Sequence, residues 1–284
     1  MMKKIKIIEC PRDAMQGMKT FIPTATKVAY LNKLLAVGFD TLDFGSFVSS
    51  KAIPQMKDTA EIVEQLDLSG SNTKLLAIVA NMRGAQDAVK FSQIHYLGYP
   101  MSISETFQVK NTHKNIIQSL EELAAISELC QHSGKELVVY ISMGFGNPYG
   151  DLYNPEIVAQ FAGVLVSLGA SVISLADTVG LATAVEIEHL YSIVKNVSNK
   201  IEWGVHLHAT ANEAHNKVMA AIKAGCQRID GAILGYGGCP MADNALVGNI
   251  NTRTILNVCN GDNISTNIDQ DVFNEAEQMA SSIF

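Results

Sequence analysis

Two histidines separated by one residue form the strongest chemical signal in the sequence. His206 and His208 follow the apolar run 201–205. In a β-strand, residues two apart project from the same face, so both imidazoles would point the same way from a rigid element. Such a pair can bind a divalent metal, but two core histidines satisfied by hydrogen bonds give the same pattern. Taken alone, the motif favours the core interpretation by about two to one.

Other side chains with metal-ligating or proton-transfer chemistry follow predicted strands. Asp13 comes after the first strand and Asp43 ends the second. Cys239 lies in the glycine-rich segment 235–240, and Asn249 follows ten positions later. A carboxylate, two imidazoles and an amide oxygen suit Mg²⁺, Mn²⁺ or Zn²⁺. Such an ion would chelate an oxygen-rich substrate and act as a Lewis acid.

Three further residues have two interpretations each. Arg12 keeps its proton and can stabilise a developing oxyanion, or it can form a surface ion pair. The thiol of Cys239 can transfer a proton if its pKa is tuned, or it can fill space as a small apolar group. Asp177 can orient a ligand or cap the following helix, and capping is favoured.

Composition bounds the class of protein. The chain has 284 residues, 48% of them hydrophobic and 17% charged, and a net charge of -7. The absence of a basic block argues against nucleic acid as a partner. Neither a signal peptide nor a membrane-spanning run is recognisable, so no membrane partner is expected. Five widely spaced cysteines indicate a reduced, cytoplasmic compartment.

Strand-like and helix-like patterns alternate along the whole sequence, which predicts a single (β/α)8 TIM barrel over residues 1–284. An open doubly wound sheet is the alternative, because periodicity does not show closure. The predicted strands are 5–9, 41–44, 74–79, 94–97, 137–142, 172–175, 201–206 and 228–230. The predicted helices are 25–36, 59–65, 85–90, 116–130, 155–166, 184–194, 212–224 and 246–258.

Connection lengths indicate where the active site lies. Connections into strands are short, whereas several connections out of strands are long, and long loops without secondary structure usually serve function. In a barrel they would gather at the C-terminal face of the strands, where such enzymes keep their active sites. Strands 1, 2, 7 and 8 would be neighbours there, so their polar residues should converge. The long connections are 10–24, 98–114, 143–154 and 231–245.

Six motifs, in this order along the chain, resemble the 3-hydroxy-3-methylglutaryl-CoA lyase family. This family belongs to the metal-dependent lyases and acyl-CoA condensing enzymes built on TIM barrels. The glycine-rich cysteine loop separates the lyases from condensing relatives such as isopropylmalate and homocitrate synthases. The motifs occupy residues 11–16, 46–51, 54–56, 174–178, 206–208 and 237–240.

The resemblance implies a reaction and a set of residue roles. The reaction cleaves 3-hydroxy-3-methylglutaryl-CoA to acetyl-CoA and acetoacetate, in leucine breakdown or ketone-body formation. A homodimer that acts on an acyl-CoA with Mg²⁺, Mn²⁺ or Zn²⁺ is implied. The metal ligands would be Asp13, His206, His208 and Asn249, with Asn244 as the alternative to Asn249. The catalytic residues would be Arg12, Asp13, Asp43, His206 and Cys239, and the substrate contacts Ser46, Asn81 and Ser174.

Some positions depart from the pattern of the family. Asp43 stands where the family usually has Glu, and Ala209 stands where Asp usually follows the histidine pair. Cys10 and Ala14 replace glycines. Three alternatives therefore stay open: a condensing enzyme or aldolase acting on a 2-oxo acid, a lyase for a related hydroxyacyl-CoA, and a barrel that has lost activity and serves as a binding protein.

Overall fold

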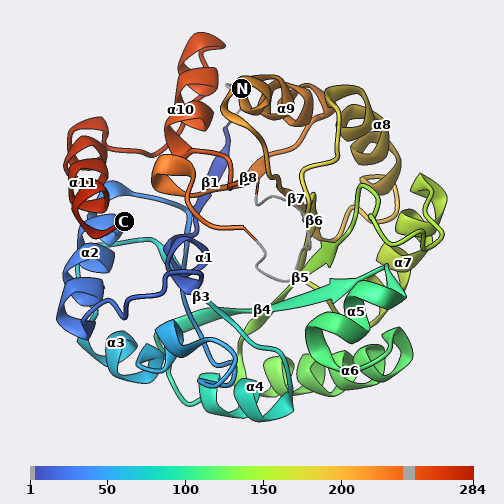
Figure 1. Ribbon diagram of the computed structural model, residues 1–284, viewed down its shortest axis with the longest axis horizontal. Helices are drawn as coiled ribbons and strands as arrows, with labels where there is room; N and C mark the ends of the chain where they lie inside the picture. Colours follow the sequence, from blue (N-terminus) through green and yellow to red (C-terminus); the bar gives the residue numbers. More distant parts are fainter. Residues whose placement is uncertain (1–3, 239–246) are drawn as a thin grey trace.

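The computed structural model describes residues 4–238 and 247–284. Within them, eight parallel strands pair in sequence order and β8 closes on β1, so the predicted TIM barrel is confirmed and the open sheet is excluded. Helices surround this ring (Figure 1). The strands are β1 (Lys6–Glu9), β2 (Thr41–Ser46), β3 (Lys74–Ile78), β4 (Ile94–Ser102), β5 (Glu136–Ser142), β6 (Val172–Ala176), β7 (Glu202–His206) and β8 (Arg228–Gly231).

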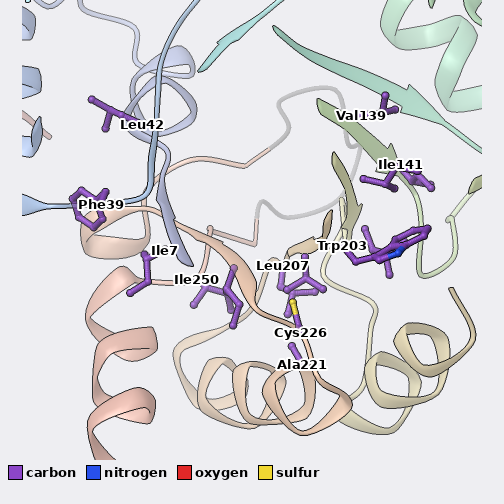
Figure 2. Packing of buried hydrophobic residues seen from close by; sticks show 14 of the residues in the cluster. Ile7, Phe39, Leu42, Val139, Ile141, Trp203, Leu207, Ala221, Cys226 and Ile250 are labelled. Carbon is purple, nitrogen blue, oxygen red and sulfur yellow. The ribbon is translucent and has the colours of Figure 1, made fainter. Parts of the chain in front are cut away.

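The strands β3, β4, β5 and β6 contribute residues to two different apolar clusters, because the two faces of a strand point to opposite sides of the barrel wall. Outward-facing side chains such as Val139 and Trp203 join a large cluster with helix residues such as Ala221 (Figure 2). A second cluster contains strand residues and one residue of the loop after β2, and therefore fills the barrel interior. Its members are Leu76, Ile78, Tyr96, Val138, Tyr140 and Val172, with Val48 packed against them.

Local capping signals define most of the helices. In α8 (Ala184–Val194), Thr183 and Glu186 form a reciprocal capping box, and Asn115 and Gln118 do the same in α6 (Ile116–Ser133). These helices follow the predicted order: α2 (Thr24–Val37), α3 (Thr59–Gln65), α4 (Met82–Ala88), α6 (Ile116–Ser133), α7 (Pro155–Ser167), α8 (Ala184–Val194) and α9 (Ala211–Ala224). Among the described helices, none combines the length and apolar character needed to cross a bilayer.

Three helices were not predicted, and two of them lie in expected loops. The connection 10–24 contains α1 (Pro11–Gln16), which begins at a proline, and a proline is favoured there because its missing N–H has no partner in a first turn. The connection 98–114 contains the end of β4 and then α5 (Glu105–Thr112). The third helix, α11 (Gln270–Ile283), buries Phe273, Ala276 and Ala280 at helical spacing and packs against α2.

The helix predicted over 246–258 is wrong at its start. The structure has α10 (Thr252–Gly261), and Asn251 caps it by accepting a hydrogen bond from the Arg253 N–H at 2.9 Å. Asn249 pairs with His208 in an isolated β-bridge, and the cap residue Asn251 pairs in the same way with Ala232. This pairing holds the chain extended, because its backbone groups bond across the barrel rim and not along a helix. Short 3-10 turns, η1 (Pro54–Met56) and η2 (Ile233–Gly235), complete the elements.

Candidate metal centre and substrate cavity

Four predicted site residues come together at the C-terminal end of the barrel: Asp13, His206, His208 and Asn249. They do so because β1 lies between β2 and β8, and β8 also pairs with β7. Asn249 Nδ2 donates to Asp13 Oδ2 at 2.6 Å. The rings of His206 and His208 lie with centroids 5.2 Å apart. Both imidazoles act electrostatically on Asp13. Residues up to 236 positions apart in the chain thus form one polar group at one rim.

Each imidazole uses Nδ1 in a hydrogen bond with an acceptor. Nδ1 of His206 lies 3.1 Å from Asp230 Oδ2, and Nδ1 of His208 lies 2.9 Å from the carbonyl oxygen of Val247. With the proton on Nδ1, each ring keeps an acceptor lone pair on Nε2. A carboxylate or carbonyl bound to Nδ1 is the usual support of a metal-ligating histidine. This arrangement fits a metal site better than a purely structural pair.

The imidazoles differ in their electrostatic surroundings. Burial opposes the charged form of His206, but its hydrogen bond and ion pair with Asp230 raise its pKa above the ordinary value. Burial lowers the pKa of His208, and the neighbouring His206 lowers it further. His208 is therefore the ring whose neutral, ligating form is favoured by its surroundings.

Three potential metal ligands, one of which is His206, lie close together at this end of the barrel. Ligand atoms of Cys10, His206 and Asp230 all lie within 4.8 Å of one another. Asp230 Oδ1 is buried and has no hydrogen-bond partner in the described part of the chain. Burial, followed by the charges of Asp230, Asp43 and Asp13, raises the pKa of the Cys10 thiol, so sulfur stays protonated. A protonated thiol is not a metal ligand, so a cation at this end of the barrel would be held by the carboxylates and imidazoles and not by Cys10.

Arg12 is held on three sides. Its Nη2 donates to Asp43 Oδ2 at 2.5 Å, and its Nη1 donates to Asp13 Oδ1 at 2.9 Å and to Gln16 Oε1 at 3.0 Å. The side chain is 11% exposed. Burial alone would lower its pKa, but Asp43 and Asp13 raise it above the ordinary range. Arg12 is therefore a fixed cation in a mostly dry site and not a surface ion pair.

The two carboxylates beside Arg12 have opposite pKa shifts. Burial pushes the pKa of Asp13 upward, but Arg12 and the two histidines outweigh it and lower this pKa to about 2. Burial raises the pKa of Asp43 to about 6, despite its ion pair with Arg12. Asp13 is consequently ionised over the whole physiological pH range, whereas a fraction of Asp43 keeps its proton around pH 6.

The backbone passes very close to the site at Gly237. Its φ is +105°, a left-handed conformation that favours glycine. A Cβ there would lie 2.8 Å from Asp13 Oδ2 and would collide with Asn249 Nδ2. The predicted catalytic Cys239 and the alternative ligand Asn244 lie outside the described residues.

A cavity of about 260 Å³ opens next to Arg12, Asp13, His206 and His208. The other wall residues come from α1, from the loop after β2, from the ends of β3 to β6 and from α5, and most are apolar. They are Gln16, Val48, Ala52, Ile53, Ile78, Ala80, Pro100, Phe107, Asn111, Thr112, Tyr140, Ser142, Ala176 and Thr178.

The three residues expected to contact substrate are not in this wall. Ser46 Oγ accepts from the Val48 N–H at 3.1 Å, and Asn81 caps α4 by accepting from the Gly84 N–H at 2.9 Å. Ser174 is buried, and its Oγ has no hydrogen-bond partner among residues 4–238 and 247–284. Their role as substrate contacts stays a prediction.

Sequence reasoning missed several residues that support the site. Asp230 orients His206, and Gln16 Nε2 donates to Asp13 Oδ1 at 2.6 Å. Glu9 accepts from the Ile233 N–H at 2.7 Å and from Thr252 Oγ1 at 2.6 Å. It thus ties β1 to both ends of the loop that carries the cysteine. A signal existed for Glu9 and Asp230, since each is a carboxylate that follows an isoleucine at the carboxyl end of a predicted strand.

Lys217 of α9 is another buried residue that was missed. Its Nζ donates to Asp177 Oδ2 at 2.9 Å and to the carbonyl oxygen of His208 at 2.8 Å. Asp177 also accepts from the Ala182 N–H, which precedes the start of α8. Asp177 therefore organises the loop before α8 and, through Lys217, the backbone of His208. The only available signal was a lysine on the apolar face of a helix.

Comparison with known proteins places the chain among a set of lyases. A family model described as HMGL-like matches residues 4–280. Hydroxymethylglutaryl-CoA lyase of Mus musculus, a mitochondrial protein, is 31% identical over 270 residues, which are 94% of this chain and 81% of the relative. A 3-hydroxy-3-isohexenylglutaryl-CoA/hydroxy-methylglutaryl-CoA lyase of Pseudomonas aeruginosa is 30% identical over 99% of this chain and 93% of the relative.

Solved structures agree with this placement. An HMG-CoA lyase from Acinetobacter baumannii, in complex with coenzyme A and 3-methylmalate, superposes with a TM-score of 0.91 at 29% identity. That alignment covers 99% of this chain and 91% of the other.

Proposed function

The chain belongs to the HMGL-like family, and we propose that it cleaves 3-hydroxy-3-methylglutaryl-CoA to acetyl-CoA and acetoacetate. One observation carries this proposal. Arg12, which is bonded to Asp13, lines a cavity of about 260 Å³ together with Asp13 and the histidine pair. The relatives that match over most of the chain are lyases, which favours cleavage over condensation or aldol chemistry with a 2-oxo acid. A barrel without activity would not need a buried arginine beside an open cavity.

We infer that Asp13, His206, His208 and Asn249 hold the cation, which is Mg²⁺ or Mn²⁺, with Zn²⁺ as the alternative. When bound, the ion supplies Lewis-acid polarisation of the substrate oxygens. The support of both histidines through Nδ1 favours this set, because it leaves Nε2 for the ion. Ligation by Asn249 would use Oδ1, so its amide must turn, since Nδ2 now donates to Asp13.

The roles of the other residues follow from their charges. Arg12, fixed by Asp43, would stabilise the enolate oxygen of acetyl-CoA as the carbon–carbon bond breaks. Cys239 would transfer a proton, as the resemblance implies. Ser46 binds the backbone N–H of Val48, and Asn81 follows Ala80 in the chain. By positioning these two cavity residues, Ser46 and Asn81 would influence how the substrate binds.

Three broader properties belong to the same proposal. We propose that residues 1–284 make one domain with an acyl-CoA as its small-molecule partner, supported by the coenzyme A in the structure of the Acinetobacter relative. We propose a cytoplasmic location. Relatives are named both cytoplasmic and mitochondrial, so this rests on the cysteine usage of this chain. A homodimer is proposed by family analogy alone.

The direct test is acetoacetate release from 3-hydroxy-3-methylglutaryl-CoA. We expect release by protein loaded with Mg²⁺ or Mn²⁺, loss of release after chelation, and recovery on adding either ion. The His206→Ala variant should release none and should retain less metal. If the loaded protein turns over 2-oxo acids but not this ester, the proposal is wrong.

A further inference from the structure

Lys217 joins the loop after β6 to the end of β7. It lies on the buried face of α9, whose other buried residues are all apolar. Besides its bonds with Asp177 and with the carbonyl oxygen of His208, the ammonium donates to the carbonyl oxygen of Gly180 at 3.1 Å. An ammonium has three N–H donors, and here each has an acceptor. These bonds offset the cost of burying a charge in an apolar stripe.

The ion pair of Lys217 and Asp177 holds the backbone of both histidines. The N–H of Asp177 donates to the carbonyl oxygen of His206 at 2.9 Å, while Lys217 bonds to the carbonyl oxygen of His208. The two side chains of the pair are 3% and 1% exposed. Hydrogen bonds are stronger in such dry surroundings than in water. The end of β7 is therefore tied to one buried ion pair.

Lys217 also acts on the ring of His208, through a second route. A Cβ added at Gly180 would lie 3.2 Å from Cβ and Cγ1 of Val247, so the Val247 side chain packs directly over this glycine. The carbonyl oxygen of Val247 lies 2.9 Å from Nδ1 of His208. Lys217 therefore holds the backbone of His208 and also the glycine that supports the acceptor of its ring.

We propose that Lys217 is a positioning residue of the metal centre, whose ammonium fixes the place and the ring orientation of His208 so that Nε2 faces the cation. This inference rests on the proposed function, because it takes His208 as a metal ligand. A lysine with a purely structural role would only neutralise Asp177. The two roles differ in what happens when both charges of the pair are removed.

Two variants separate these roles. Lys217→Met keeps the length of the side chain but removes all three hydrogen bonds, and it leaves the carboxylate of Asp177 unpaired. In the double variant Asp177→Asn/Lys217→Met no charge is left unpaired, and the new amide can still accept from the N–H of Ala182. The double variant should thus regain stability, because removing both members of a buried ion pair costs much less than removing one. The bonds of the ammonium to the His208 and Gly180 carbonyls stay lost.

The affinity for Mn²⁺, measured by calorimetry without substrate, is the main readout. Loss of a group that supports a metal ligand typically weakens metal binding by about 10–100-fold. Lys217 acts through the backbone of His208, so we expect the lower end, about tenfold, in both variants. In the metal-free parent protein, long-range ¹H–¹⁵N spectra should show the His208 proton on Nδ1, and in both variants a mixture of tautomers. Parent-like Mn²⁺ affinity in the double variant would overturn the inference.

A matched control is the buried ion pair of Lys27 and Asp58. The ammonium of Lys27 lies 2.8 Å from Asp58 Oδ1 and also bonds to the carbonyl oxygen of Gln55, so it joins α2 to the segment 55–58 and not to β7. Asp58→Asn/Lys27→Met should keep the Mn²⁺ affinity of the parent. Equal weakening in both double variants would overturn the inference, since any buried ion pair would then have the same effect. Failure of the proposed metal centre would appear differently, as absence of Mn²⁺ binding by the parent protein, and the inference would fall with it.

Discussion

Substituting Gly237 by alanine should damage the metal centre although Gly237 is not itself a proposed ligand. The left-handed φ of +105° costs an alanine about 1–2 kcal/mol. The added Cβ also lies 2.8 Å from Asp13 Oδ2, where ordinary van der Waals contact begins at 3.4 Å. Relief of this contact alone requires a displacement of about 0.6 Å, and Asn249 must move as well.

A displacement of this size is large for a metal site. Ligand distances are held within about 0.2 Å, and changes in supporting groups typically weaken metal affinity by about 10–100-fold. We therefore expect Gly237→Ala to bind Mn²⁺ about 10–100-fold more weakly, measured by calorimetry, and kcat/KM at fixed metal to fall in parallel.

The control is Gly17→Ala at the end of α1. Gly17 has φ of −85°, and an added Cβ would meet no atom within 4 Å. This variant should bind Mn²⁺ like the parent protein and retain its activity. Parent-like Mn²⁺ affinity in folded Gly237→Ala would refute the reasoning, because it would mean that Asp13 and Asn249 do not form the ion's surroundings.

Three other perturbations have expected outcomes. Asp230→Asn should weaken Mn²⁺ binding about 10–100-fold, because it removes the charged partner of His206 Nδ1; unchanged affinity in calorimetry would contradict the proposed support. Burial raises the pKa of Glu9 to about 8 from 4.5, so the folded protein keeps a proton that the unfolded chain releases. The free energy of unfolding should thus fall between about pH 5 and 8, by up to about 1.4 kcal/mol per pH unit. Urea titrations across this range should show a flatter profile for Glu9→Gln, and identical slopes would contradict the assignment. Lys217→Met should lower the free energy of unfolding by about 3–5 kcal/mol, because it leaves the Asp177 carboxylate buried and unpaired; a loss below 1 kcal/mol in denaturant titrations would contradict this.

Prediction from sequence succeeded where a short local pattern was sufficient. The apolar runs located all eight strands, because each strand is buried on both faces in a barrel. The pattern failed at α1 and α5, which are short and lie in long connections. It failed also at residues 247–251, whose extended conformation depends on pairing with His208 and Ala232 far away in the chain.

The sequence by itself determined the order of the elements, the family, and the neighbourhood of Asp13 with the histidine pair, since strand order alone makes β1, β8 and β7 adjacent. Only the tertiary structure decided which partners surround them. The Asp230 carboxylate at His206, the Lys217 ammonium behind His208 and the close approach of Gly237 join residues from different strands, helices and loops. Such contacts arise when side chains from distant segments share one buried space, and no local period in the sequence encodes that.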